Sequence, residues 1–194
     1  MRARSIATLI ALTLVGLALG AAAPTSVLAG GCTITGTSGH DVLHGTPGPD
    51  VICGFRGVDD LFGHEGDDVL RGGRARDTLH GGFGDDTLLG GAGSDGLDPG
   101  RGADVSRGGA GFDGSIGPDV PGPDLWFGGP GGDFLVDLEG IDEVNGGRGA
   151  DTCLATKDNA GGDRIRGGKG IDVWDADAGD DVRGVETKAL CFAE

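Results

Sequence analysis

Residues 81–89 read GGFGDDTLL, and most of the chain consists of imperfect copies of this nine-residue unit. The unit has small residues in its first places, glycine at the fourth, aspartate at the sixth and an apolar residue at the eighth. The fourth place is glycine in fifteen of sixteen units, Ala75 being the exception. Three columns held in register over about 140 residues predict a stacked repeat architecture.

The sixth-place column is the most regular, because stepping by nine from Asp86 meets an aspartate every time until short insertions shift the frame. Its members are Asp41, Asp50, Asp59, Asp68, Asp77, Asp86, Asp95, Asp104, Asp113, Asp124, Asp133, Asp142, Asp151, Asp163, Asp172 and Asp181. The eighth-place column is Leu43, Ile52, Leu61, Leu70, Leu79, Leu88, Leu97, Ser106, Ser115, Trp126, Leu135, Val144, Cys153, Ile165, Trp174 and Arg183. Because it is mostly apolar, the eighth place predicts the core.

The first 29 residues differ from the rest in composition. Arg2 and Arg4 precede an apolar or small run from 6 to 23, and Val27 and Ala29 suit a signal peptidase. We therefore expect residues 1–29 to be a secretory signal peptide and the protein to be secreted to the extracellular space. An uncleaved membrane anchor is the alternative, disfavoured because no strongly charged segment follows the run.

The chain is strongly acidic, with a net charge of -16, and loss of residues 1–29 would remove two arginines and no acid. Such a chain has no long-range attraction for nucleic acid or for an anionic membrane surface. We expect no nucleic-acid partner and no membrane insertion. A cation is the natural small partner.

Composition favours an all-β fold. There are 44 glycines and no tyrosine, and no stretch after residue 30 has apolar residues at helical spacing. A glycine period of nine excludes collagen, and generic disorder does not require fixed columns. Glycines in the first four places allow tight turns, and places seven to nine predict a three-residue strand. Two units then make one coil, and coils stack at about 4.8 Å.

Stacking places the aspartate of one unit beside the aspartate two units later, so Asp59 neighbours Asp77. No column of lysine or arginine compensates the negative charge of these aspartates, and carboxylates about 5 Å apart repel each other. A cation between the coils would remove the repulsion. Carboxylates and carbonyls in a flexible loop suit calcium, which takes 6–8 oxygen ligands.

The pattern GGxGxDxUx resembles the repeats-in-toxin (RTX), or hemolysin-type, calcium-binding nonapeptide. The resemblance covers residues 36–184 and implies a parallel β-roll, a right-handed β-helix-like solenoid of about eight two-repeat coils with several Ca2+ ions in its turns. It implies that each sixth-place aspartate is a ligand, together with glycine carbonyls of its own turn and the next.

The pattern is weakest around residues 99–120, where Ser106 and Ser115 replace core residues and two residues are inserted. We therefore expect poorer sites at Asp104 and Asp113, with Ile116 turned inward after a register slip. Ala75 weakens its turn more mildly, as do Asp137 and Leu138, which stand in place of two glycines.

The sequence predicts five segments: the signal peptide (1–29), an N-terminal cap strand (30–35), a first repeat array (36–116), a second array continuing the same roll (117–184) and a C-terminal cap (185–194). Irregularities are expected near 99–123 and 155–157. In an oxidising compartment we expect disulfides Cys32–Cys53 and Cys153–Cys191. Strict register leaves each pair about 10 Å apart, so the caps would have to leave the roll.

No catalytic motif is recognisable. The four histidines occupy variable places of the repeat, and His64-Glu65 lacks the second histidine of HExxH. We expect no enzymatic activity. The chain is predicted to fold on binding extracellular Ca2+ and to act as a structural or interaction scaffold. The alternatives are a calcium-dependent adhesin, using Phe62, Phe112, Phe127 and Phe134, and a hydrolase accessory module.

Overall fold

The computed structural model describes residues 31–115, 122–137, 142–156, 162–176, 179–185 and 187–188, and every regular element in these ranges is a β-strand. The predicted signal peptide and the C-terminal segment with Cys191 lie outside them. In the part of the chain described, no helix is long and apolar enough to cross a bilayer.

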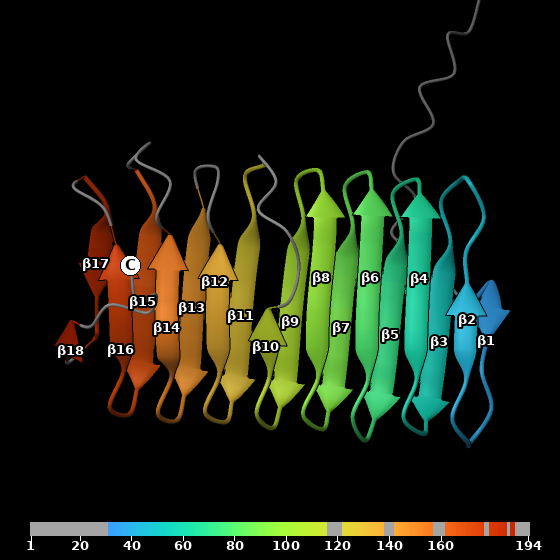
Figure 1. Ribbon diagram of the computed structural model, residues 1–194, viewed down its shortest axis with the longest axis horizontal. Helices are drawn as coiled ribbons and strands as arrows, with labels where there is room; N and C mark the ends of the chain where they lie inside the picture. The colour runs from blue at the N-terminus through green and yellow to red at the C-terminus, as the bar shows by residue number, and fades with distance from the viewer. Residues whose placement is uncertain are drawn as a thin grey trace, which may run out of the picture.

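The strands form two parallel nine-stranded sheets that lie face to face (Figure 1). The first contains β1 (Ile34–Thr35), β3 (Val51–Arg56), β5 (Val69–Arg74), β7 (Thr87–Ala92), β9 (Val105–Ala110), β11 (Leu125–Pro130), β13 (Glu143–Arg148), β15 (Arg164–Lys169) and β17 (Asp181–Arg183). The second contains β2 (Val42–His44), β4 (Asp60–Glu65), β6 (Thr78–Phe83), β8 (Gly96–Arg101), β10 (Gly114–Ser115), β12 (Phe134–Asp137), β14 (Thr152–Thr156), β16 (Val173–Ala176) and β18 (Thr187–Lys188). Successive strands alternate between sheets, which confirms the predicted all-β parallel roll.

Most strands are longer than the three residues predicted. β7, for example, continues from the seventh place of one unit through the third place of the next. The glycines allow this extension: Gly91 has a φ of +113°, and a Cβ there would collide with the carbonyl oxygen of Gly73 in the coil before. The pairing of Gly73 with Gly91 thus depends on the absence of side chains.

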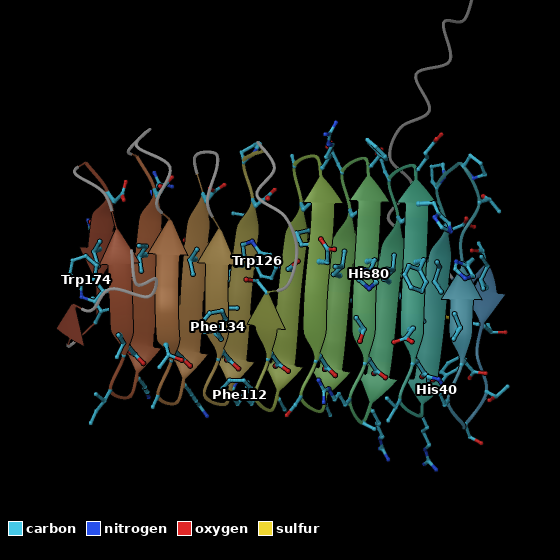
Figure 2. All side chains as sticks on the ribbon, viewed as in Figure 1. His40, His80, Phe112, Trp126, Phe134 and Trp174 are labelled. Atoms are coloured by element: carbon cyan, nitrogen blue, oxygen red, sulfur yellow. A yellow bond between two sulfur atoms is a disulfide. The ribbon has the colours of Figure 1, made fainter. Side chains whose placement is uncertain are left out.

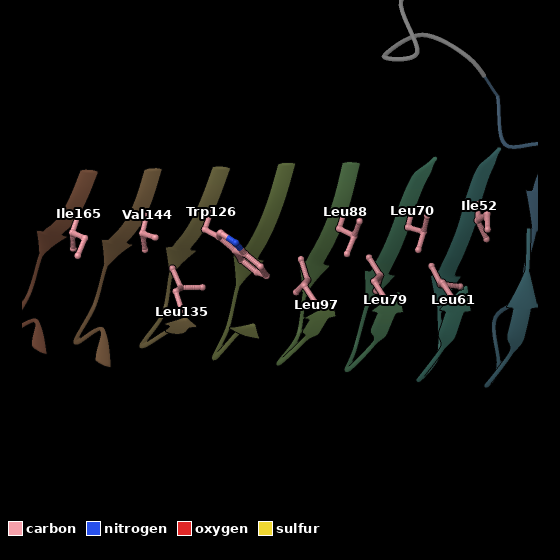
Figure 3. Close-up of a cluster of buried hydrophobic side chains, with 10 residues drawn as sticks. All are labelled: Ile52, Leu61, Leu70, Leu79, Leu88, Leu97, Trp126, Leu135, Val144 and Ile165. Atoms are coloured by element: carbon pink, nitrogen blue, oxygen red, sulfur yellow. The ribbon is translucent and has the colours of Figure 1, made fainter. Parts of the chain in front are cut away.

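The eighth-place side chains fill the space between the sheets, as predicted (Figure 3). Within each sheet they pair in register, as Leu61 does with Leu79. The buried members are Ile52, Leu61, Leu70, Leu79, Leu88, Leu97, Trp126, Leu135, Val144 and Ile165. A single apolar core, with side chains from both sheets, therefore runs along the roll.

The two serine positions lie beside the largest core residue. Ser106 is buried between Leu88 and Trp126, its register partners on either side. The indole of Trp126 extends from β11 toward the coil that contains Ser106 (Figure 3). A large side chain next to a small one conserves core volume, so the roll continues through this region. Ile116 lies outside the described residues.

The last repeat is displaced by one residue from the predicted frame. Ile165 pairs with Val182, so Val182 and not Arg183 stands in the core column. The N–H of Asp163 donates to Oδ1 of Asp180, which gives Asp180 the sixth place predicted for Asp181. The shift keeps an arginine out of an apolar core.

A second irregularity falls in β14. The pairing of β12 with β14 shifts between Phe134 and Val136, and Leu154 lies opposite Trp174. Leu154, and not Cys153, is therefore in register with the core tryptophan. The side chain of Cys153 is outside the described part, so its pairing with Cys191 stays a prediction.

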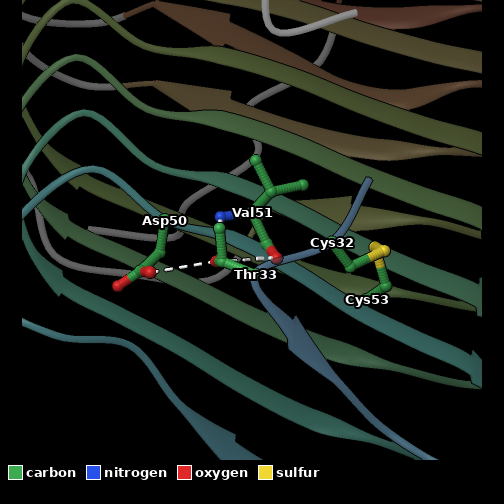
Figure 4. The surroundings of a disulfide bond; sticks show 5 residues. All are labelled: Cys32, Thr33, Asp50, Val51 and Cys53. Carbon is green, nitrogen blue, oxygen red and sulfur yellow. Dashed lines mark hydrogen bonds between the residues drawn. A yellow bond between two sulfur atoms is a disulfide. The ribbon is translucent and has the colours of Figure 1, made fainter. Parts of the chain in front are cut away.

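The N-terminal cap is tied to the first coils by a disulfide between Cys32 and Cys53, whose Cα atoms are 5.9 Å apart (Figure 4). Thr35 pairs with Cys53, as strict register requires. The chain bends at Thr33, just before β1, and Cys32 lies nearer to Cys53 than the roughly 10 Å that strict register predicts. The pairing Cys32–Cys53 is thus present.

Candidate metal centre

The sixth-place aspartates form hydrogen-bonded ladders along the roll. The N–H of Asp59 donates to Oδ1 of Asp77, and that of Asp68 to Oδ1 of Asp86, at 2.9 and 2.8 Å. The same bond crosses both insertions, since the N–H of Asp104 donates to Oδ1 of Asp124 and that of Asp142 to Oδ1 of Asp163. Each carboxylate is thereby fixed beside its neighbour two units away, as the period predicts.

The second oxygen of these carboxylates is different. Oδ2 is buried and has no hydrogen-bond partner among the described residues in Asp59, Asp68, Asp77, Asp86, Asp95, Asp104, Asp113, Asp133 and Asp151. A buried carboxylate oxygen without a partner is costly, so this array implies a ligand that supplies positive charge.

The surroundings of Oδ2 form a small cradle of oxygens. A Cβ added to Gly63 would lie 2.5 Å from Oδ2 of Asp68 and 2.5 Å from the carbonyl oxygen of Gly81. The equivalent point at Gly90 is 2.6 Å from Oδ2 of Asp95 and from the carbonyl oxygen of Gly108. First-place glycine therefore leaves room for a carboxylate of one coil and a carbonyl of the next to approach.

Burial dominates the electrostatics of the column. It raises the pKa of Asp86 to about 8 and the pKa of Asp77 and Asp104 to about 7, against the lowering effect of the backbone hydrogen bond. Repulsion from neighbouring aspartates raises the pKa of each of these three groups further, by less. A bound cation would favour the charged form of each carboxyl group.

The donor set fits a hard cation. Among the described residues, no three His, Cys, Asp or Glu side chains converge on one point, so backbone carbonyls must complete any site in the turns. Carboxylate and carbonyl oxygens in glycine-rich turns are the ligands that calcium takes. The residues that would hold it are the sixth-place aspartates together with carbonyls such as those of Gly81 and Gly108. The ion would supply charge compensation between coils.

The first two aspartates are already satisfied by threonine. The N–H of Thr37 donates to Oδ2 of Asp41 at 2.6 Å, and both N–H and hydroxyl of Thr46 donate to Oδ2 of Asp50 at 2.7 and 2.8 Å. The hydroxyl of Thr33 also donates to Oδ1 of Asp50. The backbone N–H of Thr46 is the main cause that lowers the pKa of Asp50. These carboxylates have less need of a cation than those that follow.

The other predicted ligands fall into two groups. Asp104 and Asp113 share the geometry of their neighbours despite the serines nearby, and Asp124, Asp142, Asp163 and Asp172 are buried in the same column. Asp181 is the exception: its side chain faces outward and pairs with Arg183 at 2.8 Å. It is not positioned as a turn ligand. The sequence could have indicated this one-residue shift, because arginine is a poor core residue and the apolar Val182 directly precedes Arg183.

A second ladder was not predicted. Oδ1 of Asp67 accepts from the N–H of Asp85, and Oδ1 of Asp85 accepts from the N–H of Ala103, both at 3.0 Å. These residues occupy the fifth place of alternate units, and Ser94 bonds the N–H of Phe112 similarly. The aspartates that recur at the fifth place, such as Asp67 and Asp85, could have indicated this second ladder in the sequence.

Comparison with known families agrees with this geometry, a parallel β-roll with acidic turns. The RTX calcium-binding nonapeptide repeat matches in four copies, at residues 35–70, 62–97, 127–159 and 158–182. The chain therefore belongs to the RTX calcium-binding nonapeptide repeat family. The unmatched residues 98–126 contain both serine positions and the insertion. A comparison with curated proteins finds no match.

Proposed function

We propose that the protein is a secreted calcium-binding scaffold whose β-roll becomes stable on binding extracellular Ca2+. The supporting observation is the buried Oδ2 column, in which oxygens such as those of Asp77 and Asp86 have no hydrogen-bond partner in the part of the chain that the structure describes. Without a cation these charges oppose folding, and with one they link adjacent coils. Outside the cell calcium is abundant, so the ordered form would arise after export.

Far-UV circular dichroism of residues 30–194, titrated with Ca2+ and then with chelator, tests this proposal. We expect strand signal to appear with calcium, to disappear with chelator, and to respond far less to Mg2+, which requires a stricter octahedron. A strand signal of full size in chelator would contradict calcium-dependent folding.

Export has its own test. If residues 1–29 are a cleaved signal, the protein recovered from the culture medium should begin at Gly30. An N-terminus at Met1 in a membrane fraction would favour the anchor instead.

The adhesin alternative has narrower support. Of the four phenylalanines predicted to contact a partner, only Phe112 is exposed. Phe62 stacks between His44 and His80, and Arg107 lies over the ring of Phe127. Phe134 is half-buried. Cell adhesion measured with and without calcium, using Phe112→Ser, separates an adhesin from a plain scaffold. The β-roll is a structural fold and gives no positive evidence of enzymatic activity.

A further inference from the structure

A row of rings covers the outer face of the second sheet at its N-terminal end. The row consists of His44 in β2, Phe62 in β4 and His80 in β6. Each is the ninth residue of its repeat unit, and the three pair in register. The Phe62 ring stacks on both imidazoles, with centroids 4.8 Å apart in each case. Figure 2 shows His80 on this outer face. The row lies on the opposite side of the sheet from the core.

A further imidazole joins this row from a different place of the repeat. His64 stands at the end of β4 in the second place of its unit, and its Nε2 lies 3.1 Å from Nδ1 of His44. Both side chains are exposed. His64 has a φ of +81°, in the left-handed region where its register partner Gly82 has +120°. A non-glycine residue in this conformation is uncommon, and such residues cluster at functional sites.

We propose that His44 and His64 form a binding site for a borderline divalent transition ion, of which Zn2+ is the probe. Two imidazole nitrogens that bind one zinc at about 2.0–2.1 Å in tetrahedral geometry lie about 3.3 Å apart. The observed 3.1 Å is close to that spacing. Imidazole nitrogen suits zinc, copper and nickel, whereas calcium takes oxygen.

Zinc binding would replace the hydrogen bond between the two imidazole rings with two bonds from ring nitrogen to metal. A hydrogen bond at this spacing requires one ring to be the tautomer with its proton on the shared side and the other ring to accept. To bind zinc, the donor ring would take its other neutral tautomer, its proton moving by exchange with water to the far ring nitrogen. Each neutral ring would then offer a lone pair to the ion after a small rotation of both. Water would fill the remaining positions, since two protein ligands leave a tetrahedral ion open.

The stack with Phe62 orders one ligand in advance. His44 packs on Phe62 with an interplanar angle of 16°, and the His44 and His64 rings are within 9° of parallel. Less side-chain entropy is lost on binding when rings are already held. The side chains lie on the outer face, so zinc would not compete for the carboxylate column.

Zinc titration of the calcium-loaded protein by isothermal calorimetry tests the site, with imidazole proton resonances followed by NMR. We expect one Zn2+ per chain and shifts confined to His44 and His64. His44→Asn and His64→Gly should each weaken zinc binding by about tenfold or more. His64→Gly is suited to the test because glycine already occupies the second place in other units and relieves the positive φ.

Two control variants separate ligand loss from altered stability. Phe55→Gly removes a residue of φ +74° from the second place of the preceding unit, so it relieves the same kind of strain without removing a ligand. His80→Asn removes an imidazole that stacks on Phe62 and contacts Asp98 at 3.2 Å, and that is not one of the two proposed ligands. Both should bind zinc within about twofold of the unaltered protein. Unchanged affinity in His64→Gly, or no zinc binding by the unaltered protein, would overturn the proposal.

Discussion

The backbone N–H of Asp68 donates a 2.8 Å hydrogen bond to Oδ1 of Asp86, while Oδ2 of Asp86 is buried and accepts no hydrogen bond from any described residue. One oxygen of this carboxylate thus fixes the register of two coils, and the other requires a ligand from outside the chain. The pair explains how a single residue type at a nine-residue period can specify a stack and also make that stack depend on a cation.

Asp86→Asn should have opposite effects with and without calcium. The amide keeps an oxygen for the N–H of Asp68 but removes a buried charge. In chelator the variant should therefore be more ordered than the unaltered protein. In calcium it should need an ion concentration about tenfold higher at the folding midpoint, because a charged ligand is lost.

Asp50→Asn is the matched control. Thr33 and Thr46 already satisfy the Asp50 carboxylate, so its calcium midpoint should move by no more than about twofold. Midpoints from circular dichroism give the comparison. Equal shifts at Asp50 and Asp86 would mean that the threonine contacts do not replace the ion.

For Asp113 the sequence pattern and the structure predict different effects of mutation. The serines at 106 and 115 predict that Asp86→Ala weakens the calcium response more than Asp113→Ala. In the structure, however, Asp113 is buried and bonded as its neighbours are, accepting from Asp95 at 2.9 Å and donating to Asp133 at 3.0 Å. We therefore expect comparable losses in the two alanine variants. A clearly smaller effect at Asp113 would show that the central turns bind calcium poorly.

Acid should replace calcium in part. The folded pKa values of Asp77, Asp86 and Asp104, at about 7, about 8 and about 7, lie above the ordinary value of 3.8 because of burial. The calcium-free roll therefore binds protons more tightly than the unfolded chain. Its stability is greatest below pH 3.8 and falls as pH rises through 7 to 8.

Circular dichroism in chelator should therefore show strand content rising as pH is lowered from 8 toward 4. The calcium-loaded protein is the control, and its strand content should change little near neutral pH. Strand content in chelator that is flat or falling over this range would contradict burial as the main cost.

Ala75→Gly should stabilise the roll. Ala75 occupies a fourth place, where the neighbouring units have Gly66 and Gly84, and its φ is +80°. Relief of a left-handed alanine should contribute about 1 kcal/mol to the free energy of unfolding. Thermal unfolding in saturating calcium measures the gain. Ala92→Gly, at an exposed site in β7 without positive φ, should give no gain; equal gains would remove the backbone explanation.

Periodicity predicted the stack, the core column and the pairing of aspartates two units apart, because these depend only on spacing. Contacts that depart from the period were missed. The final one-residue shift to Asp180 and Val182 follows from core packing and not from counting. His44 and His64 are brought together across coils although they stand at different places of the repeat.

The energetics also needed the structure. Spacing predicted repulsion between carboxylates as the reason for a cation, whereas burial is the larger effect at Asp86. How deeply a turn residue lies is not encoded in one column. The sequence also did not show that Thr46 donates hydrogen bonds to the Asp50 carboxylate. By sequence alone, Thr46 looks like any polar residue in a variable place.

Hydrogen exchange of the backbone amides, measured in calcium and in chelator, tests the dependence on calcium most directly. The N–H groups of Asp59, Asp68 and Asp77 donate within the aspartate ladders, so their exchange reports whether the coils are joined. We predict strong protection in calcium and near-complete loss of it in chelator at pH 7.5. Protection of these amides that persists unchanged in chelator would contradict the account.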